Sequence, residues 1–141
     1  MGKKKRIIIS IGSNFNQKVN IDFAKRQLAT VLGNDIVFSK EIWTMPVGIE
    51  SDKFINCICV SSTNHTFTQM KNAFKHIEKQ CGRSKKNNRE NIIPLDVDIL
   101  MYGDEKFHND DWSREYIKKL IGDFENEKDN LILDPTIKVK E

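Results

Sequence analysis

The sequence predicts an α+β fold with a ferredoxin-like β-α-β-β-α-β core, an antiparallel sheet with helices packed on it, and a divergent C-terminal tail. Two observations predict this fold. Short runs rich in β-branched and aromatic residues alternate with stretches whose apolar residues recur every three or four positions. No internal repeat or Pro- and Gly-rich linker divides the 141 residues, so we expect a single domain over residues 1–141. We expect its core over residues 6–103 and its tail over residues 104–141.

The first half of the core contains three predicted strands and one helix. The apolar run at residues 6–12, which a Gly-Ser-Asn sequence ends, is interpreted as a buried strand. Apolar residues at helical spacing predict a helix over residues 19–32. Residues 35–43 are expected to form the second strand, and residues 54–61 the third. The Pro- and Gly-containing segment between these two strands, residues 44–53, is expected to be a loop.

The second half of the core begins with the clearest helix signal. Residues 66–69, Thr-Phe-Thr-Gln, match a capping box, and the apolar residues over 67–81 fall on one stripe of a helix. A polar, basic loop is expected at residues 83–91. Residues 94–102 then form the fourth predicted strand.

The tail differs from the core in charge. Residues 1–103 carry 16 basic and 9 acidic side chains, whereas residues 104–141 carry 7 and 11. An anionic ligand is therefore expected to bind to the core. Within the tail, the pattern predicts a helix over residues 112–124, with Ser113 as its N-cap, and a short strand over residues 130–140.

The composition argues against several classes of protein. With 38% hydrophobic and 30% charged residues, the chain is not typical of disordered or fibrous proteins. No apolar run approaches the roughly 20 residues that span a bilayer, and no signal-peptide pattern follows the basic start. Three Cys residues cannot pair completely, which argues against a secreted disulfide scaffold. We therefore expect a cytoplasmic monomer with small-molecule partners and with neither membrane nor nucleic-acid partners.

The sharpest local feature is the pair Asp96 and Asp98 in the fourth predicted strand. Residues two apart in a strand share a face, and their Cα atoms lie about 6.5–7 Å apart. Two carboxylates at this spacing suit a pair of hard cations such as Mg²⁺, which bind carboxylate and phosphate oxygens. The alternative interpretation is a strand with one solvated face. Against that alternative, we expect the apolar Leu100 and Tyr102 on the same face as the two carboxylates.

A basic segment precedes this strand and contains four cationic side chains: Arg83, Lys85, Lys86 and Arg89. Beside a carboxylate pair, such cations suit a polyphosphate that binds together with Mg²⁺. The alternative is an ordinary solvated loop. A nucleic-acid interface is a further alternative, but the sequence lacks the aromatic-rich strands of sheet-type RNA-binding domains.

A third feature combines a hydroxyl, an apolar side chain, an aromatic ring and an amide: Thr44, Val47, Phe54 and Asn56. Such residues can hold a flat heterocycle by stacking and by hydrogen bonds to its edge. Taken alone, the same residues are equally explained as a loop and the start of a strand.

Together, the three features resemble the 6-hydroxymethyl-7,8-dihydropterin pyrophosphokinases, enzymes of folate synthesis. The resemblance covers residues 6–103 and depends on five motifs: Ile11-Gly12-Ser13-Asn14, Thr44 with Pro46-Val47-Gly48, Phe54-Ile55-Asn56, Ile77-Glu78 with Gly82-Arg83, and Leu95-Asp96-Val97-Asp98-Ile99-Leu100 with Tyr102-Gly103. It implies Mg²⁺-dependent transfer of pyrophosphate from ATP, the co-substrate, to the hydroxymethyl group of the dihydropterin, with release of AMP.

The resemblance also implies roles for individual residues. Asp96 and Asp98 would bind two Mg²⁺ ions and would act in catalysis together with Arg83. The residues that would form the pterin pocket are Thr44, Val47, Phe54 and Asn56. Those that would bind the nucleotide and its triphosphate are Glu78, Arg83, Lys85 and Arg89.

The resemblance is incomplete in two segments. Residues 90–93 are Glu-Asn-Ile-Ile, where the family has Trp-Gly-Pro-Arg, and neither a Pro-His pair nor an Arg followed by an aromatic aligns beyond residue 103. We hypothesise that Trp112 supplies the lost aromatic ring, and that Lys118 or Lys119 supplies a lost cation. The alternative function is a catalytically weak or inactive relative that binds a ligand or a protein partner. A small RNA-binding module is a third hypothesis.

Overall fold

The computed structural model describes residues 4–33 and 35–125, and this part of the chain forms six strands and five helices. The strands are β1 (Lys5–Ser13), β2 (Val37–Phe38), β3 (Ile42–Thr44), β4 (Phe54–Thr63), β5 (Asp96–Tyr102) and β6 (Glu105–Lys106). The helices are α1 (Gln17–Leu32), α2 (Phe67–Gln80), α3 (Lys85–Arg89), α4 (Asn109–Trp112) and α5 (Glu115–Glu125). Within the described residues, no helix has the length and apolar character needed to cross a membrane.

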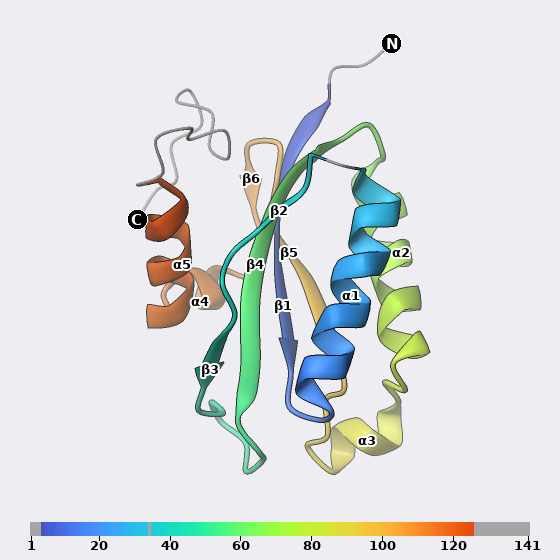
Figure 1. Cartoon of the computed structure of the whole chain (residues 1–141), viewed down its shortest axis with the longest axis vertical. Coiled ribbons are helices and arrows are strands. Elements are labelled where there is room, and N and C mark those ends of the chain that lie inside the picture. The colour runs from blue at the N-terminus through green and yellow to red at the C-terminus, as the bar shows by residue number, and fades with distance from the viewer. Residues whose placement is uncertain (1–3, 34, 126–141) are drawn as a thin grey trace.

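The strands form one antiparallel sheet in the order β2-β4-β1-β5-β6, and β3 also pairs with β4. The long strand β1 lies between β4 and β5 at the centre of the sheet (Figure 1). The predicted strands therefore lie in the order fourth (β5), first (β1), third (β4) and second (β2 and β3) across the sheet. This arrangement, with helices packed on the sheet, confirms the predicted α+β fold.

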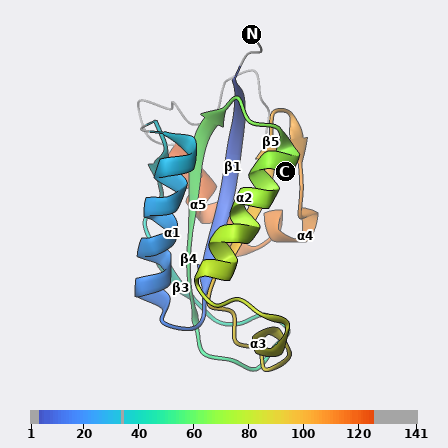
Figure 2. The same ribbon diagram turned by 90° about the vertical axis from the view of Figure 1, so that its right-hand side faces the viewer.

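One face of the sheet is covered by α1 and α2, which lie side by side on it (Figures 1 and 2). Alternation along β1 points Ile7, Ile9 and Ile11 to this face, where each is at most 1% exposed. Full burial of such a side chain stabilises the fold by roughly 1.5–3 kcal/mol. The two helices contribute apolar stripes: Ile21, Ala24 and Leu28 from α1, and Met70, Phe74 and Ile77 from α2. Val19, where the first predicted helix begins its apolar spacing, is 69% exposed and lies outside this core.

The opposite face of the sheet has a covered half and an open half. In the covered half, Ile8 of β1 packs with Ile58 and Val60 of β4 and with the apolar side of α5. Helix α5 lies on the far side of the sheet from α1 and α2 (Figure 1). The other half of this face, toward the C-terminal end of β1, is reached only by the start of α5 and holds the candidate site.

The second predicted strand, over residues 35–43, is two short strands in the structure. Both β2 and β3 pair with β4, and Ser39 lies between them. The Ser39 N–H donates to the Ile58 carbonyl at 2.8 Å, and the Ser39 hydroxyl accepts from the Ile58 N–H at 2.9 Å. The prediction of one continuous strand is wrong because a side-chain oxygen replaces a backbone acceptor at this point of the ladder.

The basic segment predicted as a loop over residues 83–91 contains the short helix α3. The Ser84 hydroxyl accepts a hydrogen bond from the Asn87 N–H at 3.1 Å, which is an N-cap interaction. The prediction of a loop throughout is therefore wrong, because Ser84 satisfies a backbone donor of the first turn.

The tail helix predicted over residues 112–124 begins three residues later, as α5, and Trp112 instead ends the separate short helix α4. Ser113 does not cap its N-terminus as predicted. Its hydroxyl instead donates to the Asp110 carbonyl at 2.7 Å and lies at the C-terminal end of α4. The strand predicted over residues 130–140 lies outside the described residues.

A β-bulge in β5 changes which side chains share a face. The pairing of β1 with β5 shifts between Ile8 and Ile9, and Leu100 is the extra residue. Leu100 packs in the α5 core, as expected, but the Tyr102 ring lies on the other face, edge-on to Phe67 with ring centroids 5.9 Å apart. The expectation that Tyr102 shares the face of the two Asp residues is wrong, because one extra residue reverses the alternation.

Candidate active site

The open half of the sheet forms a cavity of about 550 Å³. Its floor is built from three neighbouring strands. Gly12 of β1 pairs with Asn56 of β4 and with Asp96 of β5, and Ser10 of β1 pairs with Asp98 of β5. Cross-strand partners share a face, so the sheet register brings these polar residues together although they are far apart in the sequence.

One side of this cavity is lined by all four residues predicted to hold a flat heterocycle: Thr44, Val47, Phe54 and Asn56. The buried Asn56 amide donates a hydrogen bond to the Thr44 hydroxyl, which fixes the orientation of the amide. Val47 is 65% exposed and leaves an apolar surface uncovered at the cavity. Gly12 leaves room for the amide in this orientation, because a Cβ at this position would lie only 2.7 Å from Asn56 Oδ1.

Asp96 and Asp98 lie side by side at the edge of the cavity, with side chains 41% and 25% exposed. Burial raises the pKa of Asp98 to about 8, and the neighbouring charge of Asp96 acts in the same direction. A divalent cation relieves such repulsion, and carboxylate oxygens are the donors that Mg²⁺ prefers. The pair therefore has both the donor type and the electrostatic requirement of a magnesium site.

The guanidinium of Arg83 lies against Asp96. Arg83 Nη1 donates to Asp96 Oδ1 at 2.9 Å and is 3.6 Å from Glu78 Oε2, while Nε donates to Asn88 Oδ1 of α3 at 2.9 Å. The Glu78 carboxylate accepts from the Val97 N–H at 2.8 Å, and burial raises the pKa of Glu78. Arg83 and Glu78 thus connect the end of α2 to the carboxylates of β5.

A second cavity, of about 500 Å³, lies on the α2 side of the same carboxylates. Asp96 and Asp98 line both cavities. The remaining lining of the second cavity includes charged and aromatic side chains: Lys71, Lys75, Glu78, Arg83, His108, Phe67, Phe74 and Phe107. Two ligands that fill the two cavities would meet at the Asp pair.

A known protein family matches most of this chain. The sequence model of the 7,8-dihydro-6-hydroxymethylpterin-pyrophosphokinase (HPPK) family matches residues 8–137. The chain belongs to the HPPK family. The resemblance derived from the sequence motifs is thereby confirmed.

A curated relative supports the same assignment. The chain is 29% identical over 106 residues to the "Folate synthesis bifunctional protein" of Arabidopsis thaliana. The aligned segment covers 74% of this chain, whereas the chain spans about a fifth, 22%, of the length of that relative.

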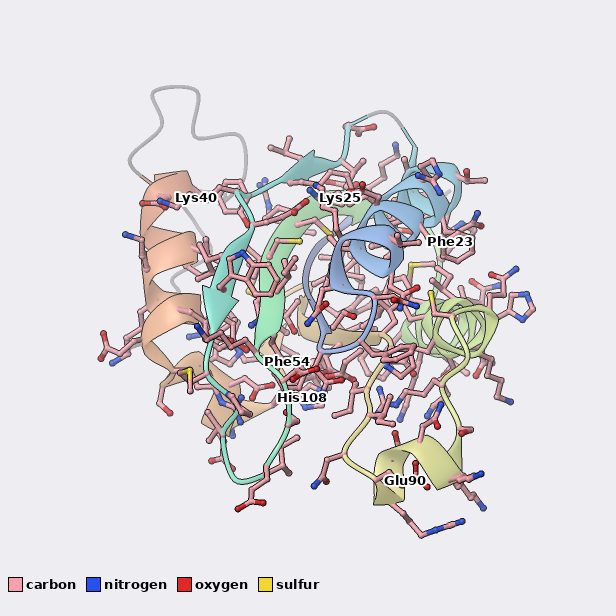
Figure 3. The ribbon with its side chains drawn as sticks, turned by 60° about the horizontal axis from the view of Figure 1, so that its bottom comes forward. Phe23, Lys25, Lys40, Phe54, Glu90 and His108 are labelled. Carbon is pink, nitrogen blue, oxygen red and sulfur yellow. The ribbon has the colours of Figure 1, made fainter. Side chains whose placement is uncertain are left out.

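Two of the residues expected to bind the nucleotide and its triphosphate are not brought to the carboxylates. Lys85 and Arg89 lie exposed on α3, and neither lines the two cavities described above. Glu90, directly after α3, lies well apart from Phe54 of the first cavity (Figure 3). The contribution of Lys85 and Arg89 to phosphate binding stays a prediction.

The structure adds residues that sequence reasoning missed. Asp111, Arg114, Glu115 and Tyr116, at the junction of α4 and α5, line the first cavity opposite the sheet. Arg114 Nε lies 3.3 Å from Asp111 Oδ1. The available signal was the pattern Arg-Glu-Tyr, an Arg close to an aromatic ring, but no family motif aligned Arg114 and Tyr116, so they were not assigned to the site.

The residues proposed to compensate for the incomplete motifs do not line either cavity. Trp112 Nε1 donates to the Leu100 carbonyl at 3.1 Å and to the Phe107 carbonyl at 3.0 Å. These hydrogen bonds connect the end of α4 to β5. Lys118 and Lys119 are exposed on α5. Among the described residues, Arg114 lines the first cavity, whereas the hypothesis gave the lost cation to a lysine.

Replacing Asp98 with Asn is expected to stabilise the protein when divalent cations are removed. Because the pKa of Asp98 is about 8 in the fold and near 3.8 when unfolded, folding binds a proton between these values. The free energy of unfolding therefore falls as the pH rises from about 4 to about 8. Asp98→Asn removes this pH-dependent destabilisation, because Asn does not ionise. Above pH 8 we expect a gain on the order of 2 kcal/mol in the free energy of unfolding, and little gain near pH 4.

Urea unfolding in EDTA at several pH values measures this difference. Asp104→Asn is the control, because Asp104 is exposed in the turn between β5 and β6. A gain from Asp98→Asn that does not increase with pH would contradict the argument.

Proposed function

We propose that this member of the HPPK family transfers pyrophosphate from ATP to the 6-hydroxymethyl group of a 7,8-dihydropterin. The observation that carries the proposal is the junction of two cavities at Asp96 and Asp98. One cavity suits a flat heterocycle, and the other suits a nucleotide. The name of the Arabidopsis relative, which refers to folate synthesis, agrees with a pterin product.

The pterin would bind in the cavity on the open half of the sheet. The ring of Phe54 offers a stacking surface, and Val47 an apolar wall. The Asn56 amide and the Thr44 hydroxyl, already oriented by their mutual hydrogen bond, would pair with the polar edge of the heterocycle. Preformed polar groups of this kind select one orientation of the ligand.

ATP would bind in the cavity on the α2 side. Lys71, Lys75 and Arg83 supply positive charge for the triphosphate, and the aromatic rings of Phe67 and Phe107 supply apolar surface. Asp96 and Asp98 would hold Mg²⁺, two ions in the arrangement that the family resemblance implies, and the bound metal would neutralise phosphate oxygens. On metal binding, we expect Arg83 to share its hydrogen bond to Asp96 with a phosphate oxygen.

The reaction requires positioning and charge neutralisation more than covalent participation of the protein. The hydroxymethyl oxygen of the pterin attacks the β-phosphorus of ATP. The bond from the β-phosphorus to the oxygen bridging to the α-phosphate breaks, AMP leaves with its electron pair, and the hydroxyl proton passes to solvent. Arg83 lines one cavity and Arg114 the other, so cationic groups approach the transferred phosphates from both sides.

Separate binding measurements for the two cavities test the proposal. We expect a reduced pterin and a non-hydrolysable ATP analogue with Mg²⁺ each to raise the melting temperature, because a ligand that binds only the folded state stabilises it. Asn56→Ala is expected to weaken pterin binding at least tenfold with little effect on the analogue. Lys75→Ala is expected to weaken the analogue selectively.

The outcomes separate the functional alternatives. Binding of neither ligand to folded protein would contradict the proposal. Selective binding of both ligands without turnover would instead favour the ligand-binding module considered from the sequence. That the protein acts as a cytoplasmic monomer with small molecules as its partners stays a prediction, and gel filtration tests the oligomeric state.

Replacing Gly12 with Ala is expected to damage the pterin cavity selectively. The added Cβ would lie 2.7 Å from Asn56 Oδ1, so the amide must move and lose its hydrogen bond to Thr44. We expect pterin affinity to fall about tenfold or more, with ATP-analogue affinity changed less than twofold.

Gly122→Ala is the matched control, because a Cβ at Gly122 in α5 meets no atom within 4 Å. Fluorescence titration with the pterin measures both variants. Equal pterin affinity for Gly12→Ala and the parent protein would show that the Asn56 orientation is not part of the binding site.

A further inference from the structure

A histidine and a third carboxylate lie beside Asp98. His108 comes from the segment between β6 and α4, and its Nε2 atom is 3.8 Å from Asp98 Oδ1. One ligand atom from each of Asp98, His108 and Asp111 can be chosen so that all three lie within 4.8 Å of one another. We propose that these three side chains form a binding site for a divalent transition-metal cation, of the class of Mn²⁺, Co²⁺ or Zn²⁺.

The spacing of the donors fits one shared ion after a small closure. Ligand atoms bound to one such cation at about 2.0–2.2 Å lie roughly 3–3.5 Å from each other. The 3.8 Å between Asp98 and His108 is close to that value. Rotation of partly exposed side chains closes the rest, since the His108 side chain is 48% exposed.

The backbone around the site holds the three residues in place. Asp98 lies in β5, which pairs with the central strand of the sheet. The Asp111 N–H donates to the His108 carbonyl at 2.8 Å, so these two residues close a single turn. Trp112, the next residue, is hydrogen-bonded to the Leu100 carbonyl of β5. The turn is therefore tied to the same strand that carries Asp98.

The charges around Asp98 favour an added cation. Asp96 already pairs with Arg83, and Asp111 with Arg114. Within the described part of the chain, the ion pairs give Asp98 no basic partner except His108, at 3.8 Å. A divalent ion between Asp98, His108 and Asp111 would balance two carboxylates that the protein places next to one imidazole.

The imidazole decides the class of metal. Mg²⁺ prefers oxygen donors and keeps much of its water, whereas imidazole suits Zn²⁺ and the transition metals. A site with one nitrogen and two carboxylate donors therefore favours a transition cation over Mg²⁺. The site does not depend on the proposed function, because it needs neither ATP nor pterin. If both proposals are right, Asp98 is shared between the transition-cation site and the magnesium site of the reaction.

Metal titration of the substrate-free protein tests the site. In a protein with His65, His76 and His108, substoichiometric Mn²⁺ is expected to broaden the NMR signals of the His108 ring first. Co²⁺ is expected to give visible absorption bands that His108→Ala abolishes and that millimolar Mg²⁺ does not displace. Calorimetry is expected to show at least a tenfold loss of Co²⁺ affinity in both His108→Ala and Asp111→Asn.

His76→Ala is the matched control, since His76 is exposed on α2 and lines neither cavity. Circular dichroism verifies that each variant is folded, and Asp111→Asn provides a second test if His108→Ala is not. Unchanged Co²⁺ affinity in either folded variant, or broadening of all three histidines together, would overturn the proposal. Failure of pyrophosphate transfer would not, because the titration contains no substrate.

Discussion

Replacing Asp98 with Ala is expected to lower kcat/KM for pyrophosphate transfer at least about 10³-fold, or roughly 4 kcal/mol of transition-state stabilisation. Asp98 lines both cavities and lies beside Asp96 on the same face of the sheet. Without it, the cation that would bridge the two substrates loses a ligand at the point of transfer. Steady-state assays over a range of Mg²⁺ concentrations measure the loss.

The control for this prediction is Asp104→Ala, which removes an exposed carboxylate from the turn after β5. We expect its activity to stay within twofold of the parent. The Asp98 variant is expected to remain folded, since loss of a carboxylate with a raised pKa relieves repulsion in the metal-free protein. A folded Asp98→Ala protein with activity within tenfold of the parent would contradict the assigned role.

Replacing Arg114 with Ala is expected to lower kcat about 10²–10³-fold, the usual cost of removing one electrostatic donor from a transition state. Arg114 lines the first cavity with Asp96 and Asp98, and its guanidinium lies 3.3 Å from Asp111. In this position it can contact a phosphate group transferred to the pterin. Single-turnover measurements at saturating substrates separate this effect from weaker binding.

Lys118→Ala is the matched control for Arg114, because Lys118 is one turn further along α5, exposed, and outside both cavities. We expect it to leave kcat within twofold of the parent. Arg114→Lys is expected to recover only part of the rate, since lysine keeps the charge but cannot donate in bidentate fashion. The opposite ranking, with Lys118→Ala the more damaging variant, would contradict this role of Arg114. It would instead support the hypothesis that a lysine of α5 replaces the missing cationic residue of the family.

The fold was predictable where local pattern and tertiary packing agree. The capping box at Thr66 forms both of its hydrogen bonds, with the Gln69 N–H at 3.1 Å and the Gln69 side chain at 2.8 Å. The stripe that includes Met70, Phe74 and Ile77 is buried against the sheet. Period and capping determine such a helix locally, so no knowledge of its neighbours was needed.

The meeting of Thr44, Asn56 and Gly12 at the first cavity was predictable for a similar reason. Thr44 and Asn56 lie on β3 and β4, which pair directly, and Gly12 pairs with Asn56 from β1. The motifs fall at strand positions whose alternation fixes the face, so the shared cavity follows once the strand order is known.

The remaining features depend on contacts that the sequence pattern does not display. Leu100 forms a bulge in β5 where that strand pairs with β1. The Ser39 hydroxyl replaces a backbone acceptor between β2 and β3 where these strands pair with β4. The chain breaks between α4 and α5, Trp112 is hydrogen-bonded to the Leu100 carbonyl of β5, and Arg114 lines the first cavity. None of these tertiary hydrogen bonds follows from local propensity, so the tail residues of the site were missed.

The most direct test is a product assay with ATP, Mg²⁺ and 6-hydroxymethyl-7,8-dihydropterin that resolves AMP from ADP and follows the pterin product by ³¹P NMR. The structure predicts pterin-dependent AMP in equal amount to a pterin diphosphate, and neither product with Asp98→Ala. Folded, parent protein that binds both substrates yet releases no AMP, or that forms ADP instead, would contradict pyrophosphate transfer at the Asp96–Asp98 junction.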